Sequence, residues 1–142
     1  MLLDFSGGFL DLEVKVAGLE DGIVASLQAH RLTGGCIVSS FLPEVLLRLR
    51  ELAPELPLGL IAQTRKRLAL WPSLPIQAVF VYHSLLSREL MSELRAENKQ
   101  VFVWTVNDRR EMLRFAELEV DGIISDDTRL LAETFAESGI SH

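Results

Sequence analysis

Short apolar runs alternate with amphipathic segments along this chain. The runs are rich in Val, Ile, Leu and Phe, and near-continuous apolar stretches of this kind are typical of strands that a parallel sheet buries on both faces. The segments between them repeat apolar residues at the three- and four-residue spacing of a helix that packs on one face. The pattern predicts strands at residues 10–16, 36–41, 58–62, 77–82, 101–106 and 120–125, with helices at residues 19–32, 43–53 and 87–98, after residue 108 and after residue 127.

Polar residues follow the last two predicted strands, in the stretch from Lys99 to Asp127. Asn107 and Asp108 end the first of these strands, and Asp108 with Glu111 three residues later forms a capping-box pattern at the start of a helix. Ligands bind at the carboxyl ends of parallel strands in α/β folds. This edge of the sheet is therefore the expected place for a functional site.

The alternation of strands and helices predicts an α/β fold. Right-handed crossovers between consecutive strands make the sheet parallel, with five to six βα units in sequential order. Alternation alone does not decide between a sheet that is curved like part of a barrel and an open doubly wound sheet. Antiparallel pairing of strand 10–16 with strand 36–41 would contradict both versions.

The predicted strand at residues 10–16 alternates aliphatic and ionisable residues, as LDLEVKV. One face of the strand therefore carries Asp11, Glu13 and Lys15. An ordinary strand with its polar face in water accounts for this pattern. The alternative is that the charged face lies in the mouth of a barrel, where Glu13 could hold a hard cation and Lys15 could meet a phosphate oxygen.

Length and composition narrow the class of protein. The 142 residues fit a single domain, residues 1–142, and are few for an eight-unit barrel of typically about 250 residues. With 49% hydrophobic and 24% charged residues, the chain is expected to be globular, and its net charge of -6 argues against a nucleic-acid partner. No apolar stretch approaches a membrane span, and the N-terminus lacks the basic flank of a signal peptide, so a cytoplasmic location is expected.

Four further features of the sequence could have either a structural or a functional role. Cys36 lies in an apolar run and is expected as a core thiol rather than a nucleophile. His83 follows a predicted strand on the edge where chemistry would occur, but no partner is evident and a solvated histidine is the alternative. The basic cluster at residues 65–67 is expected to be a solvated helix face, with an anion patch as the alternative. His30, near a helix end, is expected to be structural or solvated.

Two segments, WTVND at residues 104–108 and DGIISDD at residues 121–127, resemble the end of the glycerophosphodiester phosphodiesterase family. The members of that family are (β/α)8-type TIM barrels that hydrolyse glycerophosphodiesters with a divalent metal. EVK at residues 13–15 is similar to the family's Glu-Leu-Lys strand. SSF at residues 39–41 and YHSLL at residues 82–86 also follow the family's order. The resemblance implies a sheet like the C-terminal part of the barrel.

The resemblance also implies roles for individual residues. Glu13 would help to bind a divalent metal, Ca²⁺ or Mg²⁺, and Lys15 would lie beside the phosphate of a small-molecule phosphodiester. The other residues that would line the phosphate or glycerol pocket are Phe41, His83, Trp104 and Asn107. On its residue type, Phe41 fits a core position equally well. Lipid metabolism is the setting that the family implies.

The resemblance runs from about Leu10 to Asp127 and corresponds only to the C-terminal half of the family. The His-Arg-Gly strand, the Glu-x-Asp metal pair and the second catalytic histidine of the N-terminal half have no counterpart, so no catalytic residue is identified. Phosphodiester hydrolysis needs a nucleophile or an acid–base pair, and the isolated chain is expected to be inactive. Two hypotheses follow: a phosphodiesterase completed by a partner that supplies the missing half, or a non-catalytic half-barrel that acts as a binding or assembly module.

The first and last predicted strands would each leave an unpaired sheet edge. Unpaired backbone groups beside apolar side chains favour association. We therefore expect a homo-oligomer that covers both edges. The alternative is that the terminal segments, residues 1–9 and 128–142, cover them.

Overall fold

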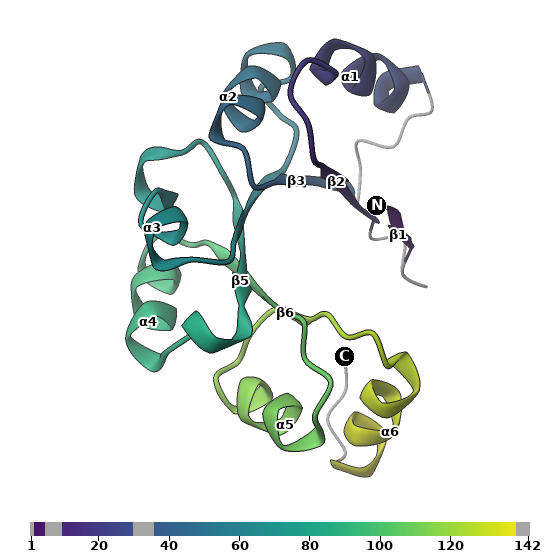
Figure 1. The fold of residues 1–142 in the computed structure, drawn as a ribbon, viewed down its shortest axis with the longest axis vertical. Helices are drawn as coiled ribbons and strands as arrows, with labels where there is room; N and C mark the ends of the chain where they lie inside the picture. Colours follow the sequence, from purple (N-terminus) through teal and green to yellow (C-terminus); the bar gives the residue numbers. More distant parts are fainter. Residues whose placement is uncertain (1, 5–9, 30–35, 139–142) are drawn as a thin grey trace. The chain divides into compact units, whose positions relative to one another are not determined.

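The computed structural model of this protein describes residues 2–4, 10–29 and 36–138 (Figure 1). Strands and helices alternate along these residues, as the sequence pattern predicts. In chain order the elements are β1 (Leu2–Asp4), β2 (Leu10–Val14), α1 (Glu20–Ala29), β3 (Cys36–Ser40), α2 (Pro43–Leu52), β4 (Leu58–Ala62), α3 (Arg65–Leu68), η1 (Trp71–Ser73), β5 (Ala78–Tyr82), η2 (His83–Leu85), α4 (Arg88–Ala96), β6 (Gln100–Trp104), α5 (Arg109–Glu117), β7 (Gly122–Ile123) and α6 (Thr128–Ser138).

The strands follow one another in the sheet as they do in the sequence, from β1 to β7. β2 pairs in parallel with β3, β3 with β4, and β6 with β7. In the β2–β3 pair Leu10 lies opposite Cys36, so the antiparallel pairing that would contradict the predicted fold is not found. The predicted parallel α/β sheet in sequential order is confirmed. The residues group into two compact units, residues 1–79 (unit 1) and residues 80–142 (unit 2); a single domain over the whole chain stays a prediction.

Five of the six predicted strands are shorter than predicted, and β2 and β7 lose the most residues. β2 ends at Val14, whereas the alternating pattern continues to residue 16. β7 consists of two residues, which form the ladder pairs Phe102–Gly122 and Val103–Ile123 with β6. Backbone hydrogen bonds from Asp121 to Val101 and from Val106 to Ile124 continue the contact beyond these pairs. The apolar runs thus extend beyond the residues that form regular ladders.

β1 is an element that the periodicity does not predict. It runs antiparallel to β2, with Leu2 opposite Leu12 and Asp4 opposite Leu10. The edge of β2 is therefore covered by β1, from the chain's own N-terminal segment. This is the arrangement predicted as the alternative to association at this edge. Residues 5–9, which complete that segment, lie outside the described residues.

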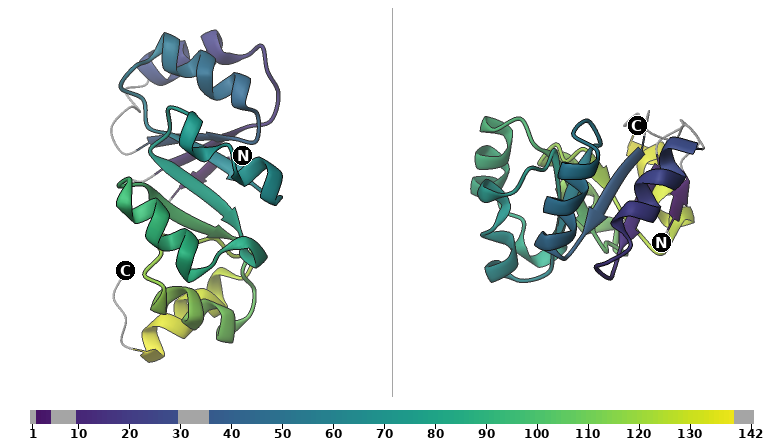
Figure 2. Two further views of the ribbon diagram at one scale, coloured as in Figure 1. Left: turned by 90° about the vertical axis from the view of Figure 1, so that its left-hand side faces the viewer. Right: turned by 90° about the horizontal axis from the view of Figure 1, so that it is seen from above.

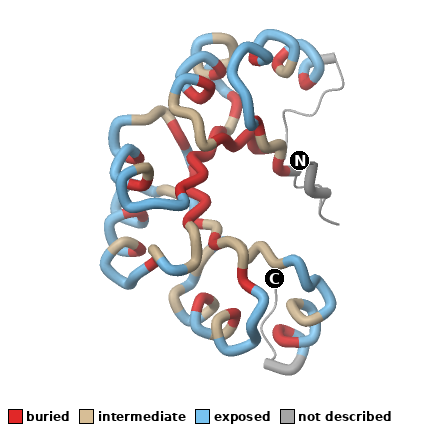
Figure 3. Tube along the Cα trace, viewed as in Figure 1, coloured by how far each residue is buried: buried red, intermediate tan, exposed pale blue. Residues whose placement is uncertain are grey.

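The core of unit 1 lies between the sheet and its helices. Every residue of β3 and β4 is buried, which is the burial expected of parallel strands (Figure 3). α1 and α2 lie side by side over these strands (Figure 2). Helix α2 buries Val45, Leu46 and Leu49 completely, at the predicted helical spacing. The part of the helix predicted at residues 30–32, with His30, lies outside the described residues.

Arg50 ties α2 to the loops that precede β4 and β5 in unit 1. Its guanidinium donates hydrogen bonds to the carbonyl oxygens of Pro54, Leu56 and Pro75 and to Oε1 of Gln77. The backbone N–H of Leu58 donates to the same Gln77 oxygen, 2.8 Å away. Burial lowers the pKa of Arg50, and the four carbonyl partners compensate for the lost hydration of its charge.

Helices α4 and α5 cover the sheet of unit 2 and begin at the predicted caps. The side chain of Ser87 accepts a hydrogen bond from the backbone of Leu90, and the carboxylate of Asp108 accepts one from Glu111. Buried apolar residues at helical spacing, Met91, Leu94, Met112 and Phe115, anchor the two helices. α6 packs against α5.

Gly122 of β7 allows the sheet to approach an aromatic ring. A Cβ atom at this position would lie 2.5 Å from Cδ1 and 2.8 Å from Cε1 of Phe102. The Phe102 ring is itself stacked on Phe80, with 4.8 Å between centroids and 16° between planes. Because the Phe80 ring limits the movement of Phe102, moving Phe102 aside would cost stability.

Asp11 of β2 is buried, with 6% of its surface exposed. Its Oδ1 accepts a hydrogen bond from Oγ of Ser39 on β3, 2.9 Å away. Burial raises the pKa of Asp11 to about 6, and the charge of Glu13 adds to this, while the Ser39 hydrogen bond acts in the opposite direction. The carboxyl group therefore holds its proton at a pH where an unfolded aspartic acid has lost it.

We expect Gly122→Ala to lower the free energy of unfolding by about 1–3 kcal/mol, since the new methyl group overpacks the Phe102 ring. Gly22→Ala in α1 is the matched control, because a Cβ there meets nothing within 4 Å. That change should be neutral or stabilise by about 0.5–1 kcal/mol, since alanine favours a helix interior. Urea unfolding followed by circular dichroism measures both. Equal stability of the two variants would contradict the packing described for Gly122.

The raised pKa of Asp11 predicts a pH dependence of stability. Between pH 3.8 and about 6 the unfolded chain has released this proton and the folded chain retains it, so the free energy of unfolding falls as the pH rises. The contribution is about 3 kcal/mol over this window. Asp11→Asn should remove it, and the difference between the wild type and Asp11→Asn in urea unfolding at each pH isolates the effect.

Ser39→Ala provides the control for the Asp11 prediction. It removes the hydrogen bond that favours the carboxylate, so the loss of stability should extend to higher pH and become larger in total. A wild-type profile parallel to that of Asp11→Asn would show that Asp11 titrates at its ordinary pKa in the folded chain.

Candidate functional site

The predicted residues of unit 1 lie at the carboxyl ends of β2 and β3. Glu13 is in β2 and Lys15 follows it, with 4.0 Å between Oε2 of Glu13 and Nζ of Lys15. The Glu13 side chain is 19% exposed and the Lys15 side chain 71% exposed. Because both side chains are accessible, a negative and a positive group are presented together where ligands bind in such sheets.

Cross-strand hydrogen bonds hold this end of the sheet. Oγ of Ser40 donates to the carbonyl oxygen of Val14 at 2.7 Å and accepts the backbone N–H of Leu42 at 3.1 Å. Phe41, the predicted aromatic residue of the pocket, follows β3 and is half-buried. Its carbonyl oxygen accepts a hydrogen bond from Nη1 of Arg67 in α3, at 2.6 Å. The backbone at the end of β3 is thereby fixed on both sides.

The three residues of the basic cluster at residues 65–67 differ in their contacts. Arg65 and Lys66 are exposed, as expected of a solvated helix face. Arg67 is partly buried and bonds to the loop after β3, so it has a structural contact. Cys36 is buried, as predicted for a core thiol, and burial with the nearby Asp11 charge raises the pKa of its thiol.

Glu13 and Asp11 lie two residues apart on β2 and therefore on the same face of the strand. Their oxygens are the type of ligand that hard cations such as Ca²⁺ and Mg²⁺ bind. Such ions need about six or more oxygen ligands, and Asp11 is engaged with Ser39 while Glu13 lies beside Lys15. Among the described residues, no group of three or more His, Cys, Asp or Glu side chains is arranged to hold a metal. These residues alone do not make up a metal site.

In unit 2 the ring of Tyr82 contacts the rings of both His83 and Trp104. The ring centroid of Tyr82 lies 4.4 Å from that of His83 and 5.1 Å from that of Trp104, the latter in an edge-to-face arrangement. Nε1 of Trp104 donates a hydrogen bond to the carbonyl oxygen of Phe80, 3.0 Å away, which fixes the indole. Tyr82 was not among the predicted site residues. Its position at the end of a strand, two residues after Phe80, is the signal that could have indicated it.

Asn107 connects the ends of β6 and β7 in unit 2. Its Oδ1 accepts hydrogen bonds from Oγ of Ser125 and the backbone N–H of Asp126, both at 2.9 Å. Its Nδ2 donates to Oδ2 of Asp126 at 3.3 Å. The residue is exposed at the carboxyl edge, as a substrate-binding role requires, and it also has a structural role in holding the loop after β7.

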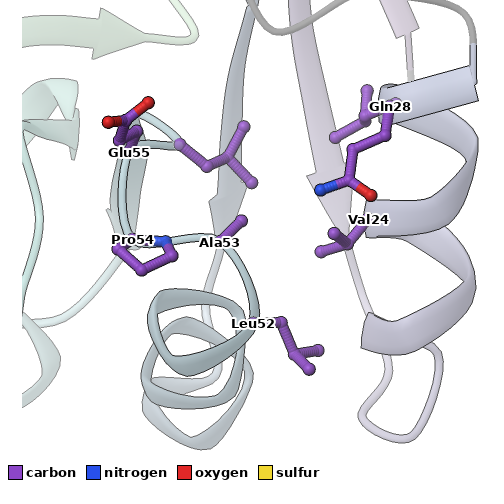
Figure 4. Close-up of a pocket in the computed structure, with 8 residues that line it drawn as sticks. Val24, Gln28, Leu52, Ala53, Pro54 and Glu55 are labelled. Atoms are coloured by element: carbon purple, nitrogen blue, oxygen red, sulfur yellow. The ribbon is translucent and has the colours of Figure 1, made fainter.

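A hollow of about 440 Å³ lies in unit 1 away from these residues (Figure 4). It is found between α1 and α2 and the segment that leads into β4, and its lining residues are Val24, Leu27, Gln28, Leu52, Ala53, Pro54, Glu55 and Leu56. It contains no residue from the carboxyl ends of the strands. The hollow is therefore separate from the predicted site.

Within the described ranges, none of the helices combines the length and the apolar character needed to cross a membrane.

Comparisons with known proteins identify relatives of this chain. A curated glycerophosphodiester phosphodiesterase of Caldanaerobacter subterraneus subsp. tengcongensis is 26% identical over 128 residues, which are 89% of this chain and 53% of the relative. The glycerophosphodiester phosphodiesterase GDPD4 of Arabidopsis thaliana is 41% identical over 51 residues, 36% of this chain and 16% of the relative. This chain thus spans about half the length of the bacterial relative.

Two solved structures have the same fold over most of this chain. A glycerophosphoryl diester phosphodiesterase-like protein of Silicibacter pomeroyi has a TM-score of 0.79 and 23% identity, over 87% of this chain and 45% of that protein. A phosphodiesterase of Oleispira antarctica, solved with the product sn-glycerol-3-phosphate, has a TM-score of 0.73 and 21% identity, over 89% of this chain and 54% of that protein. The fold is therefore a part of the (β/α)8 barrel, as the sequence resemblance implied, rather than an open doubly wound sheet.

The family model described as "Glycerophosphoryl diester phosphodiesterase family" matches residues 10–130. The match includes every predicted site residue, from Glu13 to Asn107, and all the parallel strands described above. The chain belongs to the glycerophosphoryl diester phosphodiesterase family.

Proposed function

We propose that this chain supplies the C-terminal half of a metal-dependent glycerophosphodiester phosphodiesterase site and does not turn over substrate by itself. The observation that carries the proposal is the Glu13–Lys15 pair at the carboxyl end of β2, with 4.0 Å between carboxylate and ammonium. The family membership supports a glycerophosphodiester as the small-molecule ligand. Glycerophosphodiesters are phospholipid backbones without acyl chains, so the proposed setting is lipid metabolism.

Lys15 is suited to contact a phosphate. Its ammonium is accessible and already stands beside a carboxylate, which a phosphodiester oxygen can replace as its partner. Glu13 would contribute oxygen ligands to Ca²⁺ or Mg²⁺, together with ligands from outside these residues. When bound, such a metal would neutralise charge at the phosphate.

We assign no general acid or general base for hydrolysis among the residues of this chain. Hydrolysis needs a group that activates water and a group that protonates the leaving alkoxide. His83 is the histidine at the carboxyl edge among the described residues, and its ring lies against Tyr82. The family's His-Arg-Gly segment does not occur in the 142 residues, and their Glu-x-Asp sequence, at residues 119–121, directly precedes β7, where Asp121 bonds to the backbone of Val101 and pairs with Arg95. We propose that these groups come from a partner that supplies the other half of the barrel.

The second candidate function is a non-catalytic half-barrel that acts as a binding or assembly module. A specific observation favours it: β1 pairs antiparallel with β2, from Leu2–Leu12 to Asp4–Leu10. A complete barrel would place a parallel strand at this edge, so any partner that completes it must first displace β1. An edge that the chain covers itself is the arrangement expected of a module that works without such a partner.

We expect the 142-residue chain to hydrolyse glycerophosphodiesters at background rate, with Ca²⁺, Mg²⁺ or Mn²⁺ present, because the acid–base groups are missing. Release of glycerol phosphate is the measurement. Glu13→Gln and its matched control Glu93→Gln, an exposed glutamate of α4, should both remain at background. Turnover that Glu13→Gln abolishes and Glu93→Gln retains would show that the chain is catalytic by itself.

We also expect copies of this chain to associate through a sheet edge that no other described strand covers. The proposed assembly is a homo-oligomer. β1 covers β2, so the edge in question is that of β7, a two-residue strand in unit 2. Light scattering coupled to size exclusion measures the mass. A species of 15.9 kDa that is stable across micromolar concentrations would show that the chain is a monomer and would exclude assembly with itself.

A further inference from the structure

The stretch of sequence that contains α3 and η1 differs in charge from the rest of the chain. No aspartic or glutamic acid lies between Glu55 and Glu89, although the chain has 20 such residues and a net charge of -6. The basic cluster at residues 65–67 lies within this stretch. A protein that is acidic as a whole therefore carries one segment that is locally positive.

The turns of α3 and η1 expose basic and apolar side chains next to one another. Arg65 and Lys66 are exposed, and Leu70 is exposed at 38%. The backbone N–H of Leu70 donates to Arg67, which continues the helical winding past α3 and places Leu70 one turn after Lys66, on the same face. Pro72 is exposed in the following turn. We call these four residues the α3 patch: Arg65, Lys66, Leu70 and Pro72.

Buried contacts hold the α3 patch in place. Leu68 and Trp71, which lie between its members in the sequence, are exposed at only 9% and 8%. α3 packs against β4 (Figure 1), and the side chain of Thr64 accepts the backbone N–H of Arg67 at the start of the helix. The patch is therefore an ordered surface of unit 1.

No contact within the described residues accounts for the two exposed cations. Neither Arg65 nor Lys66 has an ion-pair partner in the part of the chain that the structure describes. α1 and α2 have acidic residues in their first turns, as the helix dipole favours, whereas α3 begins with three basic residues and no acidic one. The cations are thus available to an anionic partner outside the chain.

We propose that the α3 patch docks unit 1 on an anionic lipid surface. Arginine and lysine are attracted to the charge of such a surface, and an exposed leucine can enter the boundary between headgroups and acyl chains. Peripheral membrane binding needs these two contributions together, and the patch combines them at adjacent positions. The acidic remainder of the protein is repelled by the same surface, so the patch selects one orientation.

This orientation brings the candidate site of unit 1 to the lipid. α3 follows the carboxyl end of β4, and Nη1 of Arg67 donates to the carbonyl oxygen of Phe41, after the neighbouring strand β3, at 2.6 Å. A glycerophosphodiester forms when both acyl esters of a phospholipid are hydrolysed. With the proposed function, a docked chain would meet its ligand where that ligand is released. The docking itself requires neither a metal nor turnover.

Co-sedimentation with lipid vesicles measures the docking. Vesicles of phosphatidylcholine with about 30% phosphatidylserine should bind the chain about tenfold or more tightly than vesicles of phosphatidylcholine alone. Arg65→Gln combined with Lys66→Gln should weaken binding to the anionic vesicles by about tenfold or more, since each basic residue near such a surface contributes roughly a factor of five. Equal binding to both kinds of vesicle, or binding to neither, would overturn the proposal.

Arg48→Gln combined with Arg129→Gln is the matched control for charge. It removes two positive charges from ion pairs of α2 and α6, where carboxylates already balance them. Binding to the anionic vesicles should remain within about twofold, since exposed ion pairs contribute little to folding and present little net charge. If both double variants bind equally weakly, the net charge of the chain rather than the α3 patch controls binding, and the proposal is wrong.

Leu70→Gln separates a lipid surface from other anionic partners. It should weaken binding to the anionic vesicles by about threefold or more, because an inserted apolar side chain is lost. Leu47→Gln, at a leucine of α2 that is 48% exposed, is its control and should have no effect. Circular dichroism establishes that each variant is folded.

Wild-type affinity of folded Leu70→Gln, or equally tight binding of the chain to poly-glutamate, would indicate an acidic protein partner and overturn the assignment to lipid. If Leu70→Gln does not fold, the variant of Arg65 and Lys66 still decides the proposal. Hydrolysis is not measured in these experiments. The docking surface and the proposed phosphodiesterase function can therefore fail independently.

Discussion

The parallel pairing of β2 with β3 is the constraint on which the rest of unit 1 depends. It places Glu13 opposite Ser39 and Val14 opposite Ser40. Both serines hold that register, because Ser39 donates to Asp11 and Ser40 donates to the carbonyl oxygen of Val14. A slip of one residue would turn every side chain of β2 to the other face. The Glu13–Lys15 pair would then point toward the helices and lose its access to a ligand.

In unit 2, different contacts hold the carboxyl ends of the strands in place. Trp104 is oriented by the backbone of Phe80, and the loop after β7 is held by Asn107. Gly122 lets β7 approach Phe102 closely. The arrangement of Phe102 and Trp104 in β6 therefore depends on a glycine and on one backbone carbonyl group. The two units thus present different chemistry at the ends of their strands, charged in unit 1 and aromatic in unit 2.

The sequence predicted the fold well because each βα unit has its own local pattern. The helix caps at Ser87 and Asp108 and the six strands that follow β1 were found where the pattern placed them. The pattern failed where an element depends on a neighbour. β1 is three residues long, too short for a period to be recognised, and it exists because β2 offers an edge. β7 is shorter than its apolar run, since its regular ladder with β6 has two residue pairs and the further backbone hydrogen bonds lie outside it.

For the site, the sequence by itself determined which chemical groups follow the strands and, through its motifs, which family the chain belongs to. It could not determine which of these groups meet. Tyr82 became part of the candidate site because its ring contacts both His83 and Trp104, which lie in different elements. The raised pKa of Asp11 likewise follows from burial, which outweighs the opposing effect of the hydrogen bond from Ser39 on the neighbouring strand. Residue types and local periods are properties of the chain, whereas burial and contacts between strands arise only when the sheet has formed.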